Sequence, residues 1–210
     1  MKKYISVLML IVLLAACTQV ANRSSQQHTT VAPLPSGLDV AHLTDATVAA
    51  RFDVNQIDWD RGTISMGIFV EDRYDAAEIS QLAVGDTLAF EGCGIVVDSI
   101  RFEGEYVCVN GGIEFGGADL VADDGGTYRG RMMDDHGTYS CIGNVELELA
   151  DDAVLTDCGD EPTSPSVTIS KEDIREYLEQ DRVNKDFFCL NTTVRIAGGK
   201  IVNITRRWIP

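Results

Sequence analysis

The sequence predicts a mainly β protein: a small β-sandwich or barrel, followed by a C-terminal unit made of one helix and a β-hairpin. Two observations support this fold class. Apolar and polar residues alternate over residues 47–54, at the period of a half-buried strand. Further short β-prone stretches then recur up to residue 157, separated by Gly, Asp and Asn turn signals about every 8–12 residues, as in sandwiches and barrels.

The elements follow one another in a regular way along this first part of the chain. Residues 74–82 fit no strand alternation and predict one short helix, whereas Gly104 marks the turn of a hairpin. The expected order is strand 47–54, turn 60–62, strand 63–70, helix 74–82, turn 85–86, strand 95–102, turn 103–105, strand 106–109 and turn 110–111.

The C-terminal unit begins after a segment rich in Gly, Pro, Ser and acidic residues, which predicts a linker. Ser170 is the expected N-cap of a helix whose apolar residues share one face. Residues 192–196 and 201–205 flank Gly198-Gly199 and predict a closing hairpin. The expected organisation is a signal peptide (1–16), a flexible tether (17–36), a β domain (37–157), a linker (158–167) and the helix–hairpin unit (168–210).

The N-terminus carries the three parts of a secretory signal: Lys2-Lys3, an apolar run over residues 5–16, and small residues before Cys17. The run is too short to span a bilayer, which needs about 20 residues. Leu14-Ala15-Ala16-Cys17 resembles the bacterial lipobox, which implies that Cys17 becomes an acylated N-terminus carrying chains such as palmitate. We therefore expect lipid anchoring, outside the cytoplasm, to the cell membrane or the outer membrane.

A second resemblance rests on residues 84–88 (Val-Gly-Asp-Thr-Leu), the Asn110-Gly111-Gly112 turn and the terminal segments 191–196 and 201–210. Together these segments resemble small lipoproteins of gut anaerobes with no assigned activity. The resemblance implies an uncharacterised bacterial lipoprotein family, and none of its motifs is catalytic.

Charge limits the partners of this chain. The sequence has 17 basic and 33 acidic residues, and removal of residues 1–16 takes away Lys2 and Lys3, which leaves a net charge of −18. Nucleic acid and anionic lipid headgroups attract Lys/Arg surfaces, so this balance argues against both as partners. The acidic excess favours solubility, and a cation site is the second interpretation.

Five cysteines remain besides Cys17, so in an oxidising compartment at least one thiol is free or pairs between molecules. Cys141 and Cys158 flank an expected turn at Asp151-Asp152, and a fold-back there would allow a disulfide worth about 3 kcal/mol. Cys93 and Cys108 flank the Gly104 hairpin, but in a simple register Cys108 falls opposite Ile100 and not opposite Cys93. A host that makes few disulfides would leave all five thiols reduced.

An internal repeat is the most distinctive local feature: Asp123-Asp124-Gly-Gly-Thr-Tyr recurs as Asp134-Asp135-His-Gly-Thr-Tyr. One interpretation is a pair of carboxylate loops that bind Ca²⁺. No other cofactor is expected from the sequence. The other is two successive β-turns. Neither copy has the ligand spacing of an EF-hand loop.

Motifs for catalysis are missing from the sequence. It has no Cys-x-x-Cys, no His-x-x-x-His and no Gly-x-Ser-x-Gly elbow, and Cys141 with nearby His136 is weak support for a nucleophile pair. We therefore expect a non-catalytic binding or structural module of the envelope, with a glycan, a peptide or an envelope protein as its partner. The alternative is an envelope glycan hydrolase that uses paired carboxylates.

The anchor leads to a first testable prediction. Cys17→Ser removes the sulfur that would carry the acyl chains, so the protein should leave the membrane fraction or accumulate as precursor. Mass spectrometry of the wild-type membrane fraction should find a mature chain that begins at acylated Cys17. A soluble, unacylated mature chain that begins elsewhere would contradict the lipobox interpretation.

Overall fold

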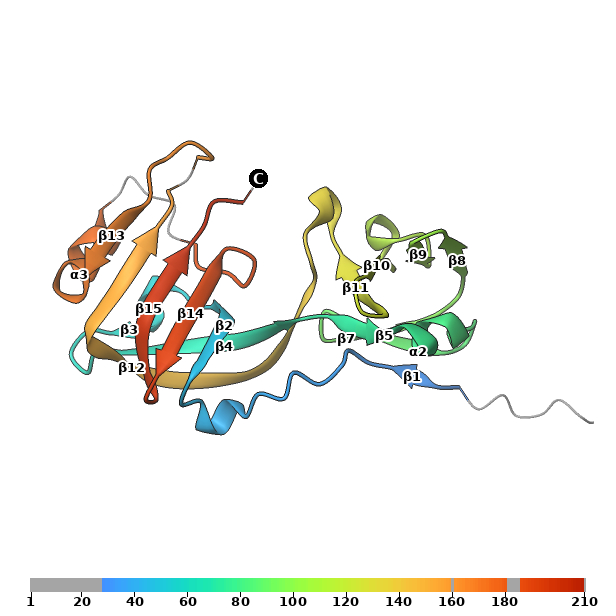
Figure 1. The fold of residues 1–210 in the computed structure, drawn as a ribbon, viewed down its shortest axis with the longest axis horizontal. Helices are drawn as coiled ribbons and strands as arrows, with labels where there is room; N and C mark the ends of the chain where they lie inside the picture. The colour runs from blue at the N-terminus through green and yellow to red at the C-terminus, as the bar shows by residue number, and fades with distance from the viewer. Residues whose placement is uncertain (1–27, 160, 181–185, 210) are drawn as a thin grey trace, which may run out of the picture.

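The computed structural model describes residues 28–159, 161–180 and 186–209. The protein is mainly β, as the sequence predicts, and its described residues form two hydrophobic cores. The larger core fills a five-stranded barrel. The smaller core fills a lobe built from residues 72–138 together with a strand from the N-terminal segment, and we call it the inserted lobe (Figure 1).

The barrel closes by a complete circle of strand pairs. In order around the barrel, its strands are β2 (Ala46–Arg51), β4 (Thr63–Glu71), β12 (Tyr139–Asp157), β15 (Lys200–Arg206) and β14 (Thr192–Ala197). Neighbours are antiparallel except β12 and β15, which run parallel, and β14 pairs back onto β2. The helix α3 (Lys171–Glu179) lies in the chain between β12 and β14. This strand order and helix position are those of an OB-fold, a Greek-key barrel.

Alternation explains which side chains fill the barrel. Ile64, Met66 and Ile68 of β4 are buried, and the residues between them are less so. The predicted alternation of residues 47–54 is confirmed at Val48, Ala50 and Phe52, all buried, although the strand itself ends at Arg51. The remaining small elements at this lobe are the 3-10 helices Val40–His42 and Val54–Gln56 and the edge strands β3 (Ile57–Asp58) and β13 (Val167–Ser170).

β12 is the longest strand of the described residues, and its two halves pair with different neighbours in one sheet. Its first half pairs with β4 from Tyr139 to Glu148, and its second half pairs with β15 and β13. The register with β15 shifts between Leu149 and Val154, so the predicted Asp151-Asp152 turn is a bulge inside a continuous strand. A bulge bends a strand without reversing it.

The C-terminal helix and hairpin belong to the barrel and do not form a separate unit, which corrects the expected boundary after residue 157. The hairpin and the helix form where the sequence predicts them, but β14 and β15 are two of the five barrel strands. The helix packs against β12 and β13, with Ile174 and Leu178 in the barrel core. Val167, expected to end the linker, already belongs to β13.

The inserted lobe consists of two small sheets around its own core. The five-stranded sheet contains β5 (Arg73–Asp75), β11 (Thr127–Arg131), β10 (Ala118–Asp123), β9 (Tyr106–Val109) and β8 (Ile100–Glu103), and the three-stranded sheet contains β1 (Thr30–Val31), β6 (Thr87–Phe90) and β7 (Cys93–Val96). The predicted helix appears as α2 (Ala76–Gln81), capped by the Asp75 carboxylate. Two 3-10 helices, Ile113–Phe115 and Met133–Asp135, lie in its loops.

Part of the expected tether belongs to the fold. Thr30 and Val31 form β1, which pairs with β6 in parallel, and the Val31 side chain is buried in the core of the inserted lobe. The Thr29 amide donates to the Asp86 carboxylate (2.8 Å). The segment expected to be flexible up to residue 36 is therefore fixed from Thr29 onward.

A buried ion pair joins the C-terminal ends of β12 and β15. Arg206 of β15 donates from Nε to Asp157 of β12 (3.0 Å) and pairs with the other carboxylate oxygen at 2.9 Å, and both side chains are almost fully buried. The Tyr177 hydroxyl and the Gly159 amide also donate to Asp157. One carboxylate thus joins β12, β15 and α3.

Removal of this carboxylate should destabilise the barrel strongly. Asp157→Ala leaves a buried guanidinium without its partner, which lowers the free energy of unfolding by about 3–5 kcal/mol. Glu148→Ala is the matched control, because it breaks the exposed Glu148–Lys200 pair between the same two strands, for an expected loss below about 1 kcal/mol. Guanidinium unfolding curves measure both. Equal losses would show that the buried pair has no special role.

Candidate functional site: a cleft between the two lobes

A cleft of about 1020 Å³ lies between the barrel and the inserted lobe. The barrel contributes residues of 51–56, 178–180 and 186–190, and the inserted lobe contributes Glu91 and Met132. Tyr139, the first residue of β12, also lines the cleft. Binding sites often form where two independently packed units meet.

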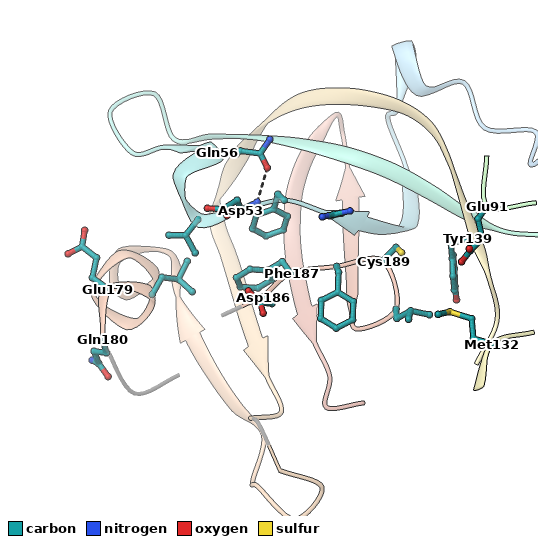
Figure 2. A pocket seen from close by; sticks show the side chains of 16 residues that line it. Asp53, Gln56, Glu91, Met132, Tyr139, Glu179, Gln180, Asp186, Phe187 and Cys189 are labelled. Atoms are coloured by element: carbon teal, nitrogen blue, oxygen red, sulfur yellow. Dashed lines mark hydrogen bonds between the residues drawn. The ribbon is translucent and has the colours of Figure 1, made fainter. Parts of the chain in front are cut away.

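Two stacked phenylalanines form the barrel wall of the cleft. The Phe52 and Phe187 rings lie 4.5 Å apart and nearly parallel, and the Phe52 amide donates to the Phe187 carbonyl oxygen (3.1 Å). Next to them, the Asp53 amide donates to the Gln56 side chain (2.7 Å) in a capping box (Figure 2). This wall is therefore fixed by backbone and side-chain bonds before any ligand arrives.

At the opposite end of the cleft, Glu91 lies near Asp72, a fully buried residue outside the cleft lining. Glu91 has a left-handed backbone (φ 50°), and its amide donates to the buried Asp72 carboxylate at 3.0 Å. Burial raises the pKa of Glu91, and the negative charge of Asp72 raises it further. The second oxygen of Asp72 has no hydrogen-bond partner among the described residues.

The thiol and the phenol in the cleft are poor nucleophiles. Burial raises the pKa of the Cys189 thiol above its ordinary value, and Arg51 offsets this only in part. Burial also raises the pKa of the Tyr139 hydroxyl, with the Glu71 charge as the next cause. Both groups therefore hold their protons more firmly than usual, whereas nucleophilic catalysis requires the opposite shift.

The aspartates of the repeat lie at turns at opposite ends of β11. Asp123 and Asp124 belong to the β10–β11 hairpin, and Asp134 and Asp135 lie beyond the other end of the strand. Asp123 pairs with Arg73, and Asp135 pairs with Arg129 (2.9 Å) and Arg131 (3.1 Å). Arginines thus hold two of the four carboxylates, and no group of three metal-binding side chains forms in the described part of the chain.

The predicted Cys141–Cys158 disulfide is wrong for this structure, in which both thiols are free. The expected fold-back does not occur, because Cys141 lies near one end of β12 and Cys158 follows the other end. The Cys141 thiol donates to the Gly143 carbonyl oxygen (3.5 Å). Cys93 and Cys108 are also unpaired, and Cys108 lies opposite Arg101, one residue from the expected Ile100.

The lipobox and Cys17 lie outside the described residues, so their role stays a prediction. Within the described part, no helix has the length and apolar character to cross a membrane.

The cleft residues were missed because they are distant in sequence. Arg51, Glu91, Met132 and Phe188 belong to different elements that come together only when the barrel closes around its insertion. A glutamate between Phe90 and Gly92 gives no local signal of burial or function. The only available signal was Phe187-Phe188 in a polar stretch, which marks buried apolar surface but not a cleft.

A raised pKa for Glu91 predicts a definite pH dependence. The native state holds this proton more tightly than the unfolded chain does, so the favourable contribution is full below the unfolded pKa and is lost as pH rises through the folded pKa. Glu91→Gln cannot ionise, so it should gain stability relative to wild type between about pH 4 and pH 7. Unfolding midpoints across this range measure the difference, with Glu105→Gln at an exposed turn as control. A difference that does not change with pH would refute this assignment.

No family model, no curated protein and no solved structure matches the chain. An OB-fold barrel by itself does not identify a ligand, since one fold supports many functions. The function of this chain is therefore inferred from the side chains of the cleft.

Proposed function

We propose that the chain is a non-catalytic binding module of the cell envelope, held outside the cytoplasm by lipid on Cys17, which takes an elongated ligand in the inter-lobe cleft. The observation that carries this proposal is the cleft itself. Its two walls come from lobes with separate cores, and it has the size of known ligand sites.

The chemistry of the walls supports the binding of a polymer segment. Phe188, Tyr139, Met132 and Leu190 offer apolar surface, while Gln56 and Gln180 offer amide donors and acceptors. Mixed surfaces of this kind recognise a chain that is polar along its backbone and apolar at intervals. Peptides and glycans share this character, and both remain ligand classes for the proposal.

The distribution of carboxylates favours binding over hydrolysis. Glu91 lies beside Tyr139 and Met132 at one end of the cleft, whereas Asp53, Asp186 and Glu179 lie toward the other end in Figure 2. Glycoside hydrolysis needs two carboxyl groups about 5–9.5 Å apart on either side of the scissile bond. In Figure 2, Glu91 is separated from the other labelled carboxylates of the cleft lining, which supports binding over hydrolysis.

One observation keeps the hydrolase as a second candidate. A general acid needs a carboxyl group with a raised pKa, and burial raises the pKa of Glu91 at the edge of the cleft. If this candidate is right, Glu91→Gln removes turnover of a glycan and leaves its binding intact.

The outer face of the barrel supports the exclusion of nucleic acid. OB-folds that bind oligonucleotides use the face of their second and third strands, which are β4 and β12 here. The outward positions include Glu146 and Glu148, which pair with Arg61 (2.8 Å) and Lys200 (3.0 Å). Arg61 and Lys200 are already neutralised by these carboxylates and are therefore less available to the phosphates of a polyanion.

The proposal predicts that cleft substitutions weaken binding and distant ones do not. Glycan and peptide arrays should give binders for the full chain, and Phe188→Ala should lower their affinity about tenfold, because it removes apolar contact worth about 1.4 kcal/mol. Phe102→Ala, an exposed phenyl group on β8, is the matched control.

Three outcomes separate the candidates. Binders that respond to Phe188→Ala and are not turned over support the proposal. Turnover that disappears in Glu91→Gln supports the hydrolase. No binders in either array, or binders that are unaffected by the cleft substitution, would refute the binding proposal.

A further inference from the structure

Met132 connects the cleft to a second hollow. Its side chain lines the inter-lobe cleft and also a smaller hollow of about 220 Å³ on the inserted lobe. The smaller hollow is lined as well by Ile113, Glu114 and Met133 from two neighbouring loops, and we call it the loop hollow. A ligand chain that leaves the cleft past Met132 therefore enters a second concave surface.

Two strongly exposed apolar side chains stand at the loop hollow. Met133, in its lining, is 69% exposed, and Phe115 is 78% exposed, the largest value among the exposed apolar residues of the described part. A side chain at Gly111, which also lines the loop hollow, would meet the Phe115 ring at 3.3 Å. Exposed apolar residues grouped at a concave surface mark interaction sites, and methionine adapts to differently shaped partners.

The loops that carry these side chains are held by specific contacts. The Ile113 amide donates to the Asp119 carboxylate (3.1 Å), and Gly112 has φ 88°, where a side chain would collide with Asp119. On the other loop, Asp135 has a left-handed backbone and binds Arg131 (3.1 Å). Phe115 and Met133 are thus presented outward by loops with defined conformations.

The charge of the combined surface favours a basic partner. The two concavities together are lined by six carboxylates and two arginines. The carboxylates are Asp53, Glu91, Glu114, Asp119, Glu179 and Asp186, and the arginines are Arg51 and Arg131. Arg131 is already paired with Asp135 and lies 5.1 Å from the Tyr106 ring centre, so its charge is largely used within the protein. A ligand with cationic side chains complements this surface.

From these observations we propose that the ligand is a basic, partly apolar segment of another polypeptide, bound in the cleft and continuing past Met132 into the loop hollow, where it covers Phe115 and Met133. This inference rests on the proposed function and extends the same site. A glycan is the less suitable occupant of the extension, because phenylalanine and methionine side chains give its hydroxyl groups no hydrogen-bond partners.

Labelled peptides test this extension directly. The probe is a fluorescent peptide of about twelve residues, roughly 40 Å when extended, in which lysine alternates with leucine and phenylalanine. A half-length peptide and a version with glutamate in place of lysine serve as comparisons. Fluorescence anisotropy measures binding to the full chain in zwitterionic nanodiscs, with empty nanodiscs as the blank.

We expect Met133→Ser and Phe115→Ser each to weaken the long peptide five- to tenfold and to leave the half-length peptide unchanged. Phe188→Ala should weaken both peptides. Phe102→Ser is the matched control, because Phe102 pairs with buried Val107 and lies on the other face of the sheet from Asp119. Glu114→Lys should weaken the long peptide more than Glu103→Lys does, and the glutamate peptide should not bind.

The outcomes distinguish the two proposals. If Phe188→Ala weakens binding and the loop substitutions do not, the cleft binds ligand and the extension is wrong. If a neutral oligosaccharide binds and the lysine peptide does not, the partner class is wrong while the proposed function stands. If no cleft substitution affects any binder, both proposals fail. All substituted residues on the loops are exposed, and unfolding midpoints confirm that each variant is folded.

Discussion

The architecture depends on β12, a single strand that pairs with two sets of neighbours. Its first half pairs with β4 and its second half pairs with β15 and β13, and its register with β15 shifts at a bulge between Leu149 and Val154. The Asp157–Arg206 pair then fixes the far end of this strand.

The same pairing explains why the barrel accepts a large insertion. Glu71, the last residue of β4, lies opposite Tyr139, the first residue of β12. The chain can therefore leave after Glu71 and return before Tyr139 without separating the two strands, and the insertion builds its own core beyond them. Because the cleft forms where the insertion meets the barrel, its walls are set by this junction.

Local patterns in the sequence predicted local structure well. Alternation located Val48 and Ala50 in a barrel strand, Gly198-Gly199 marked the last hairpin, and Ser170 stands at the N-cap of α3. The pairing of β14 with β2 joins residues about 150 positions apart, and no local pattern encodes it. The C-terminal hairpin therefore appeared to be a separate unit until the structure placed it in the barrel.

The candidate site could not be predicted for the same reason. The Asp-Asp-Gly repeat attracted attention because it is contiguous, yet its copies make turns and Asp135 is held by arginines. Burial raises the pKa of Glu91, and the charge of Asp72, which lies between β4 and β5, raises it further. Nothing in the residues around Glu91 in the sequence indicates either effect. Sequence patterns report on residues that are adjacent along the chain, whereas the cleft is lined by residues that become adjacent only in the folded protein.

The order of the strands along the chain also sets the order in which the protein can fold as it is synthesised. Every strand of the inserted lobe lies before residue 132, whereas the barrel needs β15, which ends at Arg206. The inserted lobe can therefore fold first. Until their C-terminal partners are synthesised, β2 and β4 each have one edge unpaired. Such edges are prone to aggregation. These edges are therefore exposed in the interval after the strands of the inserted lobe are complete and before β15 is available.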